Sequence, residues 1–180
     1  GKSLHIDPIV VKAKAGESEA FVQLMQEIEL PLYRTARSIV NKEEDCADAL
    51  QETMLKAFKN IHTLREPAFF KTWIFRILIN ECNKMLKNNA RALPYGELPE
   101  VPSTSKDYEK IELWDAVQHL EENLRIVIHL HYLQDMPIRQ ISDILEISTV
   151  AVKTRLHRAR KKLKHSSQFN QEMELRHGKH

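Results

Sequence analysis

A short apolar-patterned segment followed by a long basic one constrains the fold of this chain most. Residues Ile138–Leu145 have apolar side chains at helical spacing, and Glu146–Ser148 is predicted as a tight turn. The next helix carries a run of basic residues with no acid among them: Lys153, Arg155, Arg158, Arg160, Lys161, Lys162 and Lys164. Two helices joined by a tight turn, the second of them basic, are typical of a helix-turn-helix. The segment therefore predicts binding to duplex DNA.

The basic helix should present two different faces. At about 100° per residue, its apolar face holds Val152, Leu156, Ala159 and Leu163. This face should pack on the preceding helix, at Ile141, Ile144 and Leu145. The outward side and its flanks carry the candidate DNA contacts, with Lys and Arg suited to guanine edges or phosphates: Lys153, Thr154, Arg155, His157, Arg158 and Lys161. An ordinary solvated basic helix is the alternative interpretation.

Two residues of the turn carry their own expectations. Ser148 should cap the basic helix, because its side-chain oxygen can accept a bond from a backbone N–H group of the first turn. Glu146 stands where many such turns have Gly, so it should be strained if the turn requires a positive φ.

Composition favours an all-α protein of one or two small domains. The chain has 180 residues, only four Gly and 29% charged residues. The formal net charge is only +2, because an acidic segment at Glu43–Glu52 balances the basic end. Such asymmetry suggests one surface for nucleic acid and another for a protein partner.

Cysteine and hydropathy patterns argue against several classes of protein. Cys46 and Cys82 give neither a disulfide framework nor a metal spacing, so we expect no cofactor and a reducing cytoplasm. His129 and His131 lie two apart on a predicted helix and face different ways, which makes them a poor metal pair. No apolar run approaches about 20 residues and no signal-peptide pattern is present, so neither membrane spanning nor export is expected.

Helical periodicity recurs along most of the chain. Asp7 and Pro8 should start the first helix, with Asp7 as its cap, and Gly16 should interrupt it. Further helices are expected over residues 18–28, from Pro31 to Val40, over 43–61, 68–87, from 109 and over 124–133. Residues 88–108 lose the pattern and are rich in Pro and Ser. The chain is therefore predicted to be all-α, with two small helical domains at 1–90 and 109–180, the second containing the helix-turn-helix, joined by a flexible linker at 91–108.

The helix predicted over residues 43–61 should have an acidic outward face. Its inward stripe is expected to be Ala47, Leu50, Met54, Ala57, Phe58 and Ile61. The opposite side holds Asp48, Gln51, Glu52 and Leu55. An apolar side chain inside an acidic rim is typical of a protein-docking face, although single exposed Leu residues often have no role.

The helix predicted over residues 68–87 leaves a narrow strip outside its apolar face. The strip interleaves aromatic, basic and amide side chains: Phe69, Trp73, Arg76, Asn80, Asn83, Lys84 and Lys87. Such a strip suits single-stranded nucleic acid, because bases stack on rings while cations follow the phosphates. In the alternative interpretation, Phe69 and Trp73 are core residues at a helix junction. The loop at His62–Pro67 could frame a pocket for a flipped base.

One function requires a single-strand surface, an acidic docking helix, a tether and a duplex-reading helix-turn-helix together. That function is promoter recognition by a specificity subunit of RNA polymerase. An autonomous repressor is a rival that explains only the C-terminal end. A DNA-modifying enzyme such as a recombinase is a second rival, and the chain shows no Ser or Tyr placed with convergent basic residues for it.

Four stretches make the chain resemble the extracytoplasmic-function (ECF) sigma factors of bacterial RNA polymerase. They are AKAGESEAF at Ala13–Phe21, EEDCADALQETMLKAFKNI at Glu43–Ile61, FKTWIFRILIN at Phe70–Asn80 and ISTVAVKTRLHRARKKL at Ile147–Leu163. They follow one another in the expected order over nearly the whole chain.

The resemblance implies a role for each surface. Residues 1–90 would be sigma region two and 109–180 sigma region four. Docking on core polymerase would fall to Asp48, Gln51, Glu52 and Leu55. Contact with the melted −10 element would fall to Phe69, Trp73, Asn80 and Lys84, beside Arg76 of the same strip. Reading of the −35 element would fall to Lys153, Thr154 and His157, with Arg155 and Arg158 near phosphates. The family also implies a non-enzymatic cytoplasmic protein, held by an anti-sigma factor that is often in the membrane.

Overall fold

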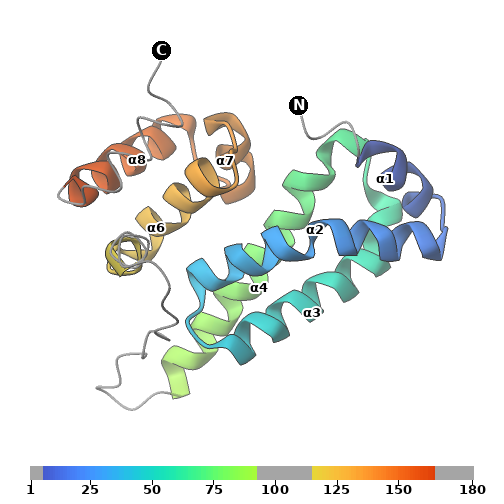
Figure 1. Ribbon diagram of the computed structural model, residues 1–180, viewed down its shortest axis with the longest axis horizontal. Helices are drawn as coiled ribbons and strands as arrows, with labels where there is room; N and C mark the ends of the chain where they lie inside the picture. Colours follow the sequence, from blue (N-terminus) through green and yellow to red (C-terminus); the bar gives the residue numbers. More distant parts are fainter. Residues whose placement is uncertain (1–5, 93–114, 165–180) are drawn as a thin grey trace, which may run out of the picture. The chain divides into compact units, whose positions relative to one another are not determined.

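The computed structural model describes residues 6–92 and 115–164 (Figure 1). Within these ranges the chain is helical and contains no β-strand. The described residues build two compact units, one mainly on residues 6–92 and the other mainly on residues 115–164. The predicted all-α fold is therefore confirmed. Of the predicted linker at 91–108, residues 91 and 92 belong to the last helix of the first unit, and residues 93–108 lie outside the described residues. No helix in the described ranges is long and apolar enough to span a membrane.

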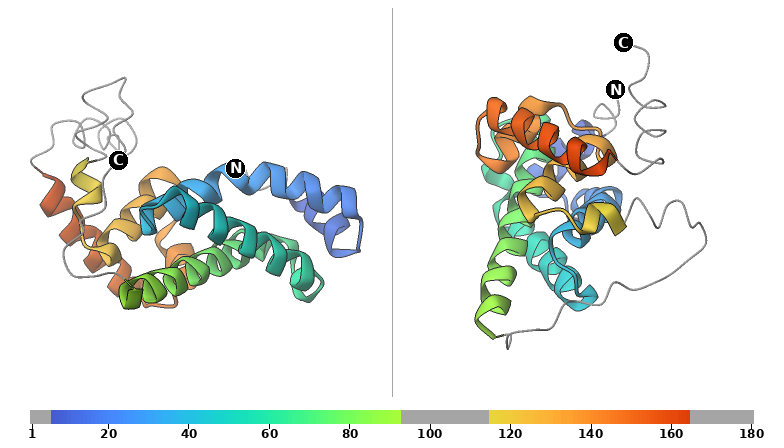
Figure 2. Two further views of the ribbon diagram at one scale, coloured as in Figure 1. Left: turned by 90° about the horizontal axis from the view of Figure 1, so that it is seen from below. Right: turned by 90° about the vertical axis from the view of Figure 1, so that its left-hand side faces the viewer.

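The first unit is a bundle of three long helices with a short helix added at its N-terminal end. Its helices are α1 (Asp7–Lys14), α2 (Ser18–Ile39), α3 (Glu43–Asn60) and α4 (Phe70–Ala92), with short 3₁₀ turns η2 (Ile61–Thr63) and η3 (Pro67–Phe69) between α3 and α4. Figures 1 and 2 show α2, α3 and α4 side by side, and each contacts the other two. Helix α1 packs on α2 and on the two 3₁₀ turns. The largest fully buried side chains of the bundle include Leu24, Leu32, Phe70, Ile74, Phe75 and Leu78.

The start of the chain differs from its prediction at two residues. Asp7 lies in the first turn of α1, and Ile6 occupies the cap position. Helix α2 runs through Pro31, where the sequence predicted a new start. Proline removes one helical N–H donor, but the carbonyl that loses it belongs to Glu27, an exposed residue that water reaches. The predicted break at Gly16 is confirmed by a φ of 102°.

The inward face of α3 matches the prediction at Leu50, Ala57 and Ile61 and differs from it at Ala47 and Phe58. Its buried residues are Cys46, Ala49, Leu50, Thr53 and Ala57, whereas Ala47 is exposed and Phe58 is 60% exposed. Small side chains fill this inward face because α3 packs against both α2 and α4. The Thr53 hydroxyl is satisfied there by donating to the Ala49 carbonyl at 2.7 Å.

Helix α4 is longer than predicted at its C-terminal end. The sequence pattern placed its end at Lys87, but the helix continues through Ala92. The Asn89 side chain donates a hydrogen bond of 2.9 Å to the carboxylate of Asp45, near the start of α3. This bond between distant segments ties down the last turns, which have too few apolar residues to predict a helix by periodicity.

The second unit contains the helix-turn-helix. After a helical turn over residues 115–118 come α6 (Glu122–Ile128), a π-helical segment η4 (His129–Leu133), α7 (Ile138–Leu145) and α8 (Thr149–Leu163). The bounds of α7 match the prediction, and α6 with η4 forms the continuous helix expected over 124–133. Helix α8 packs mainly on α6. The core of the second unit includes Leu130, Ile141, Val152 and Leu156.

Candidate nucleic-acid and protein interfaces

Helix α8 is built as the sequence predicted. The Ser148 side chain accepts a hydrogen bond of 3.0 Å from the Ala151 N–H group, which confirms the cap. The apolar face is buried throughout, at Val152, Leu156, Ala159 and Leu163. Of the partners named from the sequence, Ile141 and Ile144 are buried and Leu145 is partly buried, and α6 supplies most of the remaining surface.

The predicted DNA-contacting residues of α8 lie on its surface. Lys153, Thr154, His157, Arg158 and Lys161 are exposed, and Arg155 is half-buried. The Thr154 hydroxyl donates to the Val150 carbonyl at 2.9 Å, so its methyl group and an oxygen lone pair remain for a ligand. Burial of the opposite face fixes this outward orientation.

Two cations of the basic run bond within their own unit. The Arg160 Nε donates to the Tyr132 hydroxyl at 2.5 Å, and the Lys162 amine bonds the Glu121 carboxylate at 3.4 Å. These bonds tie the C-terminal half of α8 to η4 and to the start of α6. The structure thereby separates two anchoring cations from the cations that face outward, a division that a charge run alone does not give.

Val150 is a surface residue that the sequence analysis missed. Its side chain is 69% exposed, the most of any large apolar side chain in the described ranges. It lies in the first turn of α8, at three, four and seven residues before Lys153, Thr154 and His157. That spacing places all four on one helix face, so helical periodicity could have found it. An exposed apolar group at this position suits a thymine methyl group.

The acidic face of α3 is exposed as predicted, and it is wider than predicted. Asp48, Gln51 and Glu52 are exposed, and the Leu55 side chain is 49% exposed. Phe58, one turn further on, is covered only in part, by an edge-on contact with Phe21 at 5.2 Å between ring centroids. Leu55 and Phe58, three residues apart, therefore form an apolar pair beside the acidic residues.

The strip beside the apolar face of α4 contains both exposed and partly buried aromatic residues. Phe69 ends η3 rather than lying in α4, and its side chain is 55% exposed. Trp73 is partly buried, with its ring centroid 6.1 Å from that of Phe70 in the core. Arg76 is also partly buried, and Asn80 and Lys84 are exposed. The Trp73 ring thus packs on the core and is still partly accessible, so the structure is compatible with both the stacking and the core interpretation.

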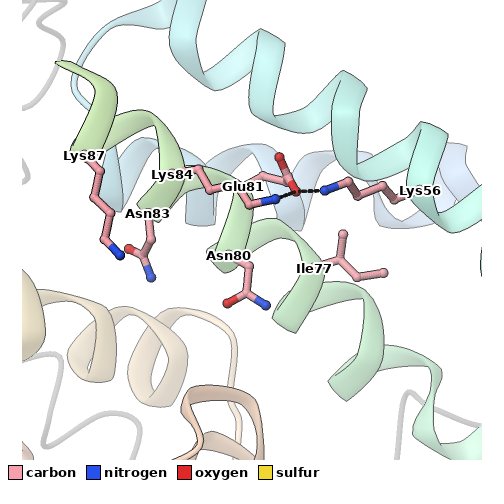
Figure 3. Close-up of a pocket in the computed structure, with 7 residues that line it drawn as sticks. All are labelled: Lys56, Ile77, Asn80, Glu81, Asn83, Lys84 and Lys87. Carbon is pink, nitrogen blue, oxygen red and sulfur yellow. Dashed lines mark hydrogen bonds and ion pairs between the residues drawn. The ribbon is translucent and has the colours of Figure 1, made fainter. Parts of the chain in front are cut away.

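A groove lies along the C-terminal part of this strip (Figure 3). It has a volume of about 420 Å³ and is lined by Lys56 of α3 and, from α4, by Ile77, Asn80, Glu81, Asn83, Lys84 and Lys87. Glu81 is buried, and its carboxylate accepts hydrogen bonds from the amines of Lys56 and Lys84, the latter at 3.3 Å. Burial alone raises the pKa of Glu81, but the bonds from the two lysines outweigh it and lower the pKa.

Two lining residues were not foreseen from the sequence. Asn83 and Lys87 belong to the predicted strip, but Lys56 and Glu81 were assigned no role. Their ion pair joins residues 25 positions apart on two helices, so no local spacing reveals it. The hydrogen bond that the Lys56 amine donates to Glu81 also raises the pKa of Lys56 and keeps the amine charged.

Comparison with known proteins gives two family matches, in chain order. The family described as sigma-70 region 2 matches residues 24–92, and that described as sigma-70, region 4 matches residues 110–163. RNA polymerase sigma factor SigV of Bacillus subtilis is 29% identical over 154 residues, which cover 84% of this chain and 93% of SigV. ECF RNA polymerase sigma factor SigM of Mycobacterium tuberculosis is 31% identical over 153 residues, 83% of this chain and 78% of SigM.

Solved structures show the same fold. CnrH, solved in complex with the cytosolic domain of CnrY, has a TM-score of 0.68 and 26% identity, covering 88% of this chain and 94% of CnrH. RpoE from Bartonella quintana, solved with the anti-sigma factor NepR, has a TM-score of 0.69 and 21% identity, covering 80% of this chain and 94% of RpoE.

Proposed function

The chain belongs to the ECF sigma factors, and from this premise we propose which of its surfaces contact polymerase and promoter DNA. As a member of this family it binds core RNA polymerase and directs promoter-specific initiation of transcription. Sigma factors are non-enzymatic initiation factors. The rival repressor and recombinase interpretations fail, because both family matches apply to one chain in sigma order.

The proposed division of labour follows the predicted domains. Residues 1–90 form the region-two domain, 91–108 the linker and 109–180 the region-four domain. Core polymerase docks on Asp48, Gln51, Glu52 and Leu55, which share the exposed face of α3. The melted −10 element lies along Phe69, Trp73, Arg76, Asn80 and Lys84. The −35 duplex meets Lys153, Thr154, Arg155, His157, Arg158 and Lys161.

One observation carries this proposal most directly. Helix α8 is capped at Ser148, buried along one face and basic along the other, as a recognition helix in a major groove requires. The region-four match covers this helix, and the region-two match covers the acidic face of α3 and the strip of α4.

The protein is proposed to act in the cytoplasm, where core polymerase is, and to be held inactive by an anti-sigma factor. RpoE, one of the two similar structures above, was solved in complex with an anti-sigma factor, NepR. Affinity purification from the native host, with and without added core polymerase, tests the proposal. We expect the anti-sigma partner to be released as polymerase binds, whereas simultaneous binding of both would contradict it.

Selection from randomised −35 sequences tests the reading of duplex DNA. Holoenzyme with Lys153→Ala or His157→Ala should prefer altered sequences, by about 1–3 kcal/mol for each bidentate base pairing that the substitution removes. Arg158→Ala should weaken binding to all sequences about equally and reduce the salt slope by about one unit, because phosphates carry little sequence information. If the Lys153 and His157 variants keep the wild-type preference, α8 does not read bases.

The strand-binding assignment has its own test at Trp73. Trp73→Ala should remove a stacking interaction worth roughly 1–3 kcal/mol and slow open-complex formation on duplex promoters. A pre-melted bubble at the −10 element should partly rescue the variant, because it removes the need to melt. A variant that the bubble does not rescue, and that melts at a much lower temperature, would make Trp73 a structural residue.

A further inference from the structure

The groove of α4 carries an excess of positive charge from two helices. Lys56 comes from α3, and Lys84 and Lys87 come from α4. Glu81 is the single acid among the residues that line it. The amides of Asn80 and Asn83 add neutral donors along the same wall (Figure 3). A groove with three cations, one buried acid and two amides is suited to an anion that several donors can share.

The buried Glu81 forms ion pairs with two of these cations, Lys56 and Lys84. It is only 7% exposed, while the side chains of Lys56 and Lys84 are 36% and 62% exposed. Figure 3 shows its carboxylate between the two amines. A lysine amine has three N–H donors, so a bond to Glu81 leaves each amine with donors for a ligand in the groove. The buried acid fixes where two otherwise flexible side chains place their charge.

The position of the groove on α4 indicates which anion it takes. Trp73, Asn80, Lys84 and Lys87 follow one another along the helix. At 1.5 Å per residue, Lys84 lies roughly 17 Å from Trp73 along the axis, a distance that a few nucleotides of extended single strand cover. A strand stacked on Trp73 would therefore bring its backbone to the groove.

We propose that this groove binds a phosphodiester of the melted promoter strand, with Lys56 and Lys84 as donors and Glu81 as the residue that positions them. This inference rests on the proposed −10 function of α4. It assigns DNA contact to Lys56 of α3, which lies one helical turn after the docking residue Glu52. It also gives a role to a buried acid inside a DNA-binding surface, where an acid would otherwise repel the ligand.

The Glu81→Gln variant separates positioning from simple electrostatics. Removing an acid makes the groove more positive, so charge alone predicts tighter binding of single-stranded DNA and a steeper salt dependence. Positioning by Glu81 predicts weaker binding of single-stranded DNA and a shallower salt dependence, because the amines of Lys56 and Lys84 lose the carboxylate that holds them in place. The two explanations therefore differ in sign.

The experiment measures binding of holoenzyme to a promoter bubble across a range of salt concentrations. Lys56→Gln should weaken binding roughly three- to tenfold and lower the salt slope by about 0.7, the value for one phosphate contact on a single strand. The control, Lys12→Gln, removes the same charge from an exposed position on α1 and should bind like wild type. A series of bubbles, each with a single neutral methylphosphonate linkage at a different −10 phosphate, then locates the contact. Wild type and Lys56→Gln should bind equally to the bubble in which the phosphate contacted by Lys56 has been neutralised.

Two results would overturn the groove assignment. One is a Lys56→Gln holoenzyme that matches Lys12→Gln at every linkage, and the other is a Glu81→Gln holoenzyme that binds more tightly than wild type. If Glu81→Gln does not fold, the Lys56 result decides alone. Failure of the proposed function looks different: wild-type holoenzyme would not prefer a promoter bubble to a scrambled one. If wild type shows that preference and Trp73→Ala weakens it, a negative Lys56 result removes the groove only.

Discussion

The Ser142 hydroxyl donates a hydrogen bond to the Ile147 carbonyl oxygen, 2.5 Å away across the turn of the helix-turn-helix. The Ile147 N–H group donates back to the Ser142 carbonyl at 3.2 Å. Together these bonds close a Schellman-type turn around Glu146, which has a φ of 57°. The side-chain bond offsets part of the strain that a left-handed residue other than Gly carries.

Glu146→Gly should stabilise the region-four unit. A left-handed conformation costs a residue with a Cβ atom about 1 kcal/mol, and Gly removes this cost. The net gain in stability is smaller, because Gly also has more conformational freedom to lose when the chain folds. Hydrogen exchange of the α7 and α8 amides measures the change within this unit. Ser142→Ala should act in the opposite direction by about 1 kcal/mol, since it removes the bond to Ile147. Slower exchange in Ser142→Ala than in wild type would contradict this account of the turn.

Val150 should sense the methyl group of a thymine in the −35 element. Replacing each −35 thymine in turn by uracil removes only that methyl group, and burial of one such group is worth about 0.8 kcal/mol. Wild-type holoenzyme should lose about fourfold in affinity at one position. Val150→Ala holoenzyme should lose less at that position and behave like wild type at the others. Equal sensitivity of both proteins at every thymine would show that Val150 contacts no methyl group.

Leu55→Glu should weaken binding to core polymerase by a few kcal/mol, the usual cost of a charge at a desolvated interface. Phe58→Ala should weaken it too, because Phe58 extends the apolar pair that begins at Leu55. Val11→Glu is the matched control, since Val11 is 52% exposed and lies on α1. Titration of labelled core polymerase measures all three, with circular dichroism to check helicity. Loss of helicity in Leu55→Glu would place Leu55 in the core, and wild-type affinity would remove this face from the docking surface.

The Glu81 ion pairs should make the first unit sensitive to acid. The folded state lowers the pKa of Glu81 below its ordinary value of 4.5, so the stability it contributes is present above that value. That contribution disappears as the pH falls through the lowered pKa of the folded protein. Glu81→Gln should therefore flatten the dependence of the free energy of unfolding on pH below 4.5. Lys56→Met should flatten it as well, since it removes a partner that lowers this pKa. Urea titrations at a series of pH values measure the free energy of unfolding. If its dependence on pH is unchanged in both variants, the Glu81 ion pairs are not the cause of the acid sensitivity.

Local sequence determined the helix-turn-helix. The bounds of α7, the Ser148 cap and the buried stripe of α8 all depend on residues within about two turns of one another, so periodicity and capping chemistry predict them. The exposure of Asp48 and Leu55 follows from the same periodicity on α3. The exposure of Val150 also follows from helical periodicity, so the sequence could have predicted it together with that of Lys153, Thr154 and His157.

Tertiary structure decided what depends on residues far apart in the sequence. Helix α3 lies against α2 and α4 together, so small residues such as Ala49 and Thr53 turn inward while Phe58 is left largely exposed. The pairing of Lys56 with Glu81 spans two helices, and it gives a buried acid to a groove that the sequence shows only as a basic strip. Periodicity describes one helix at a time, whereas packing between helices selects which side of each is covered and which charges meet.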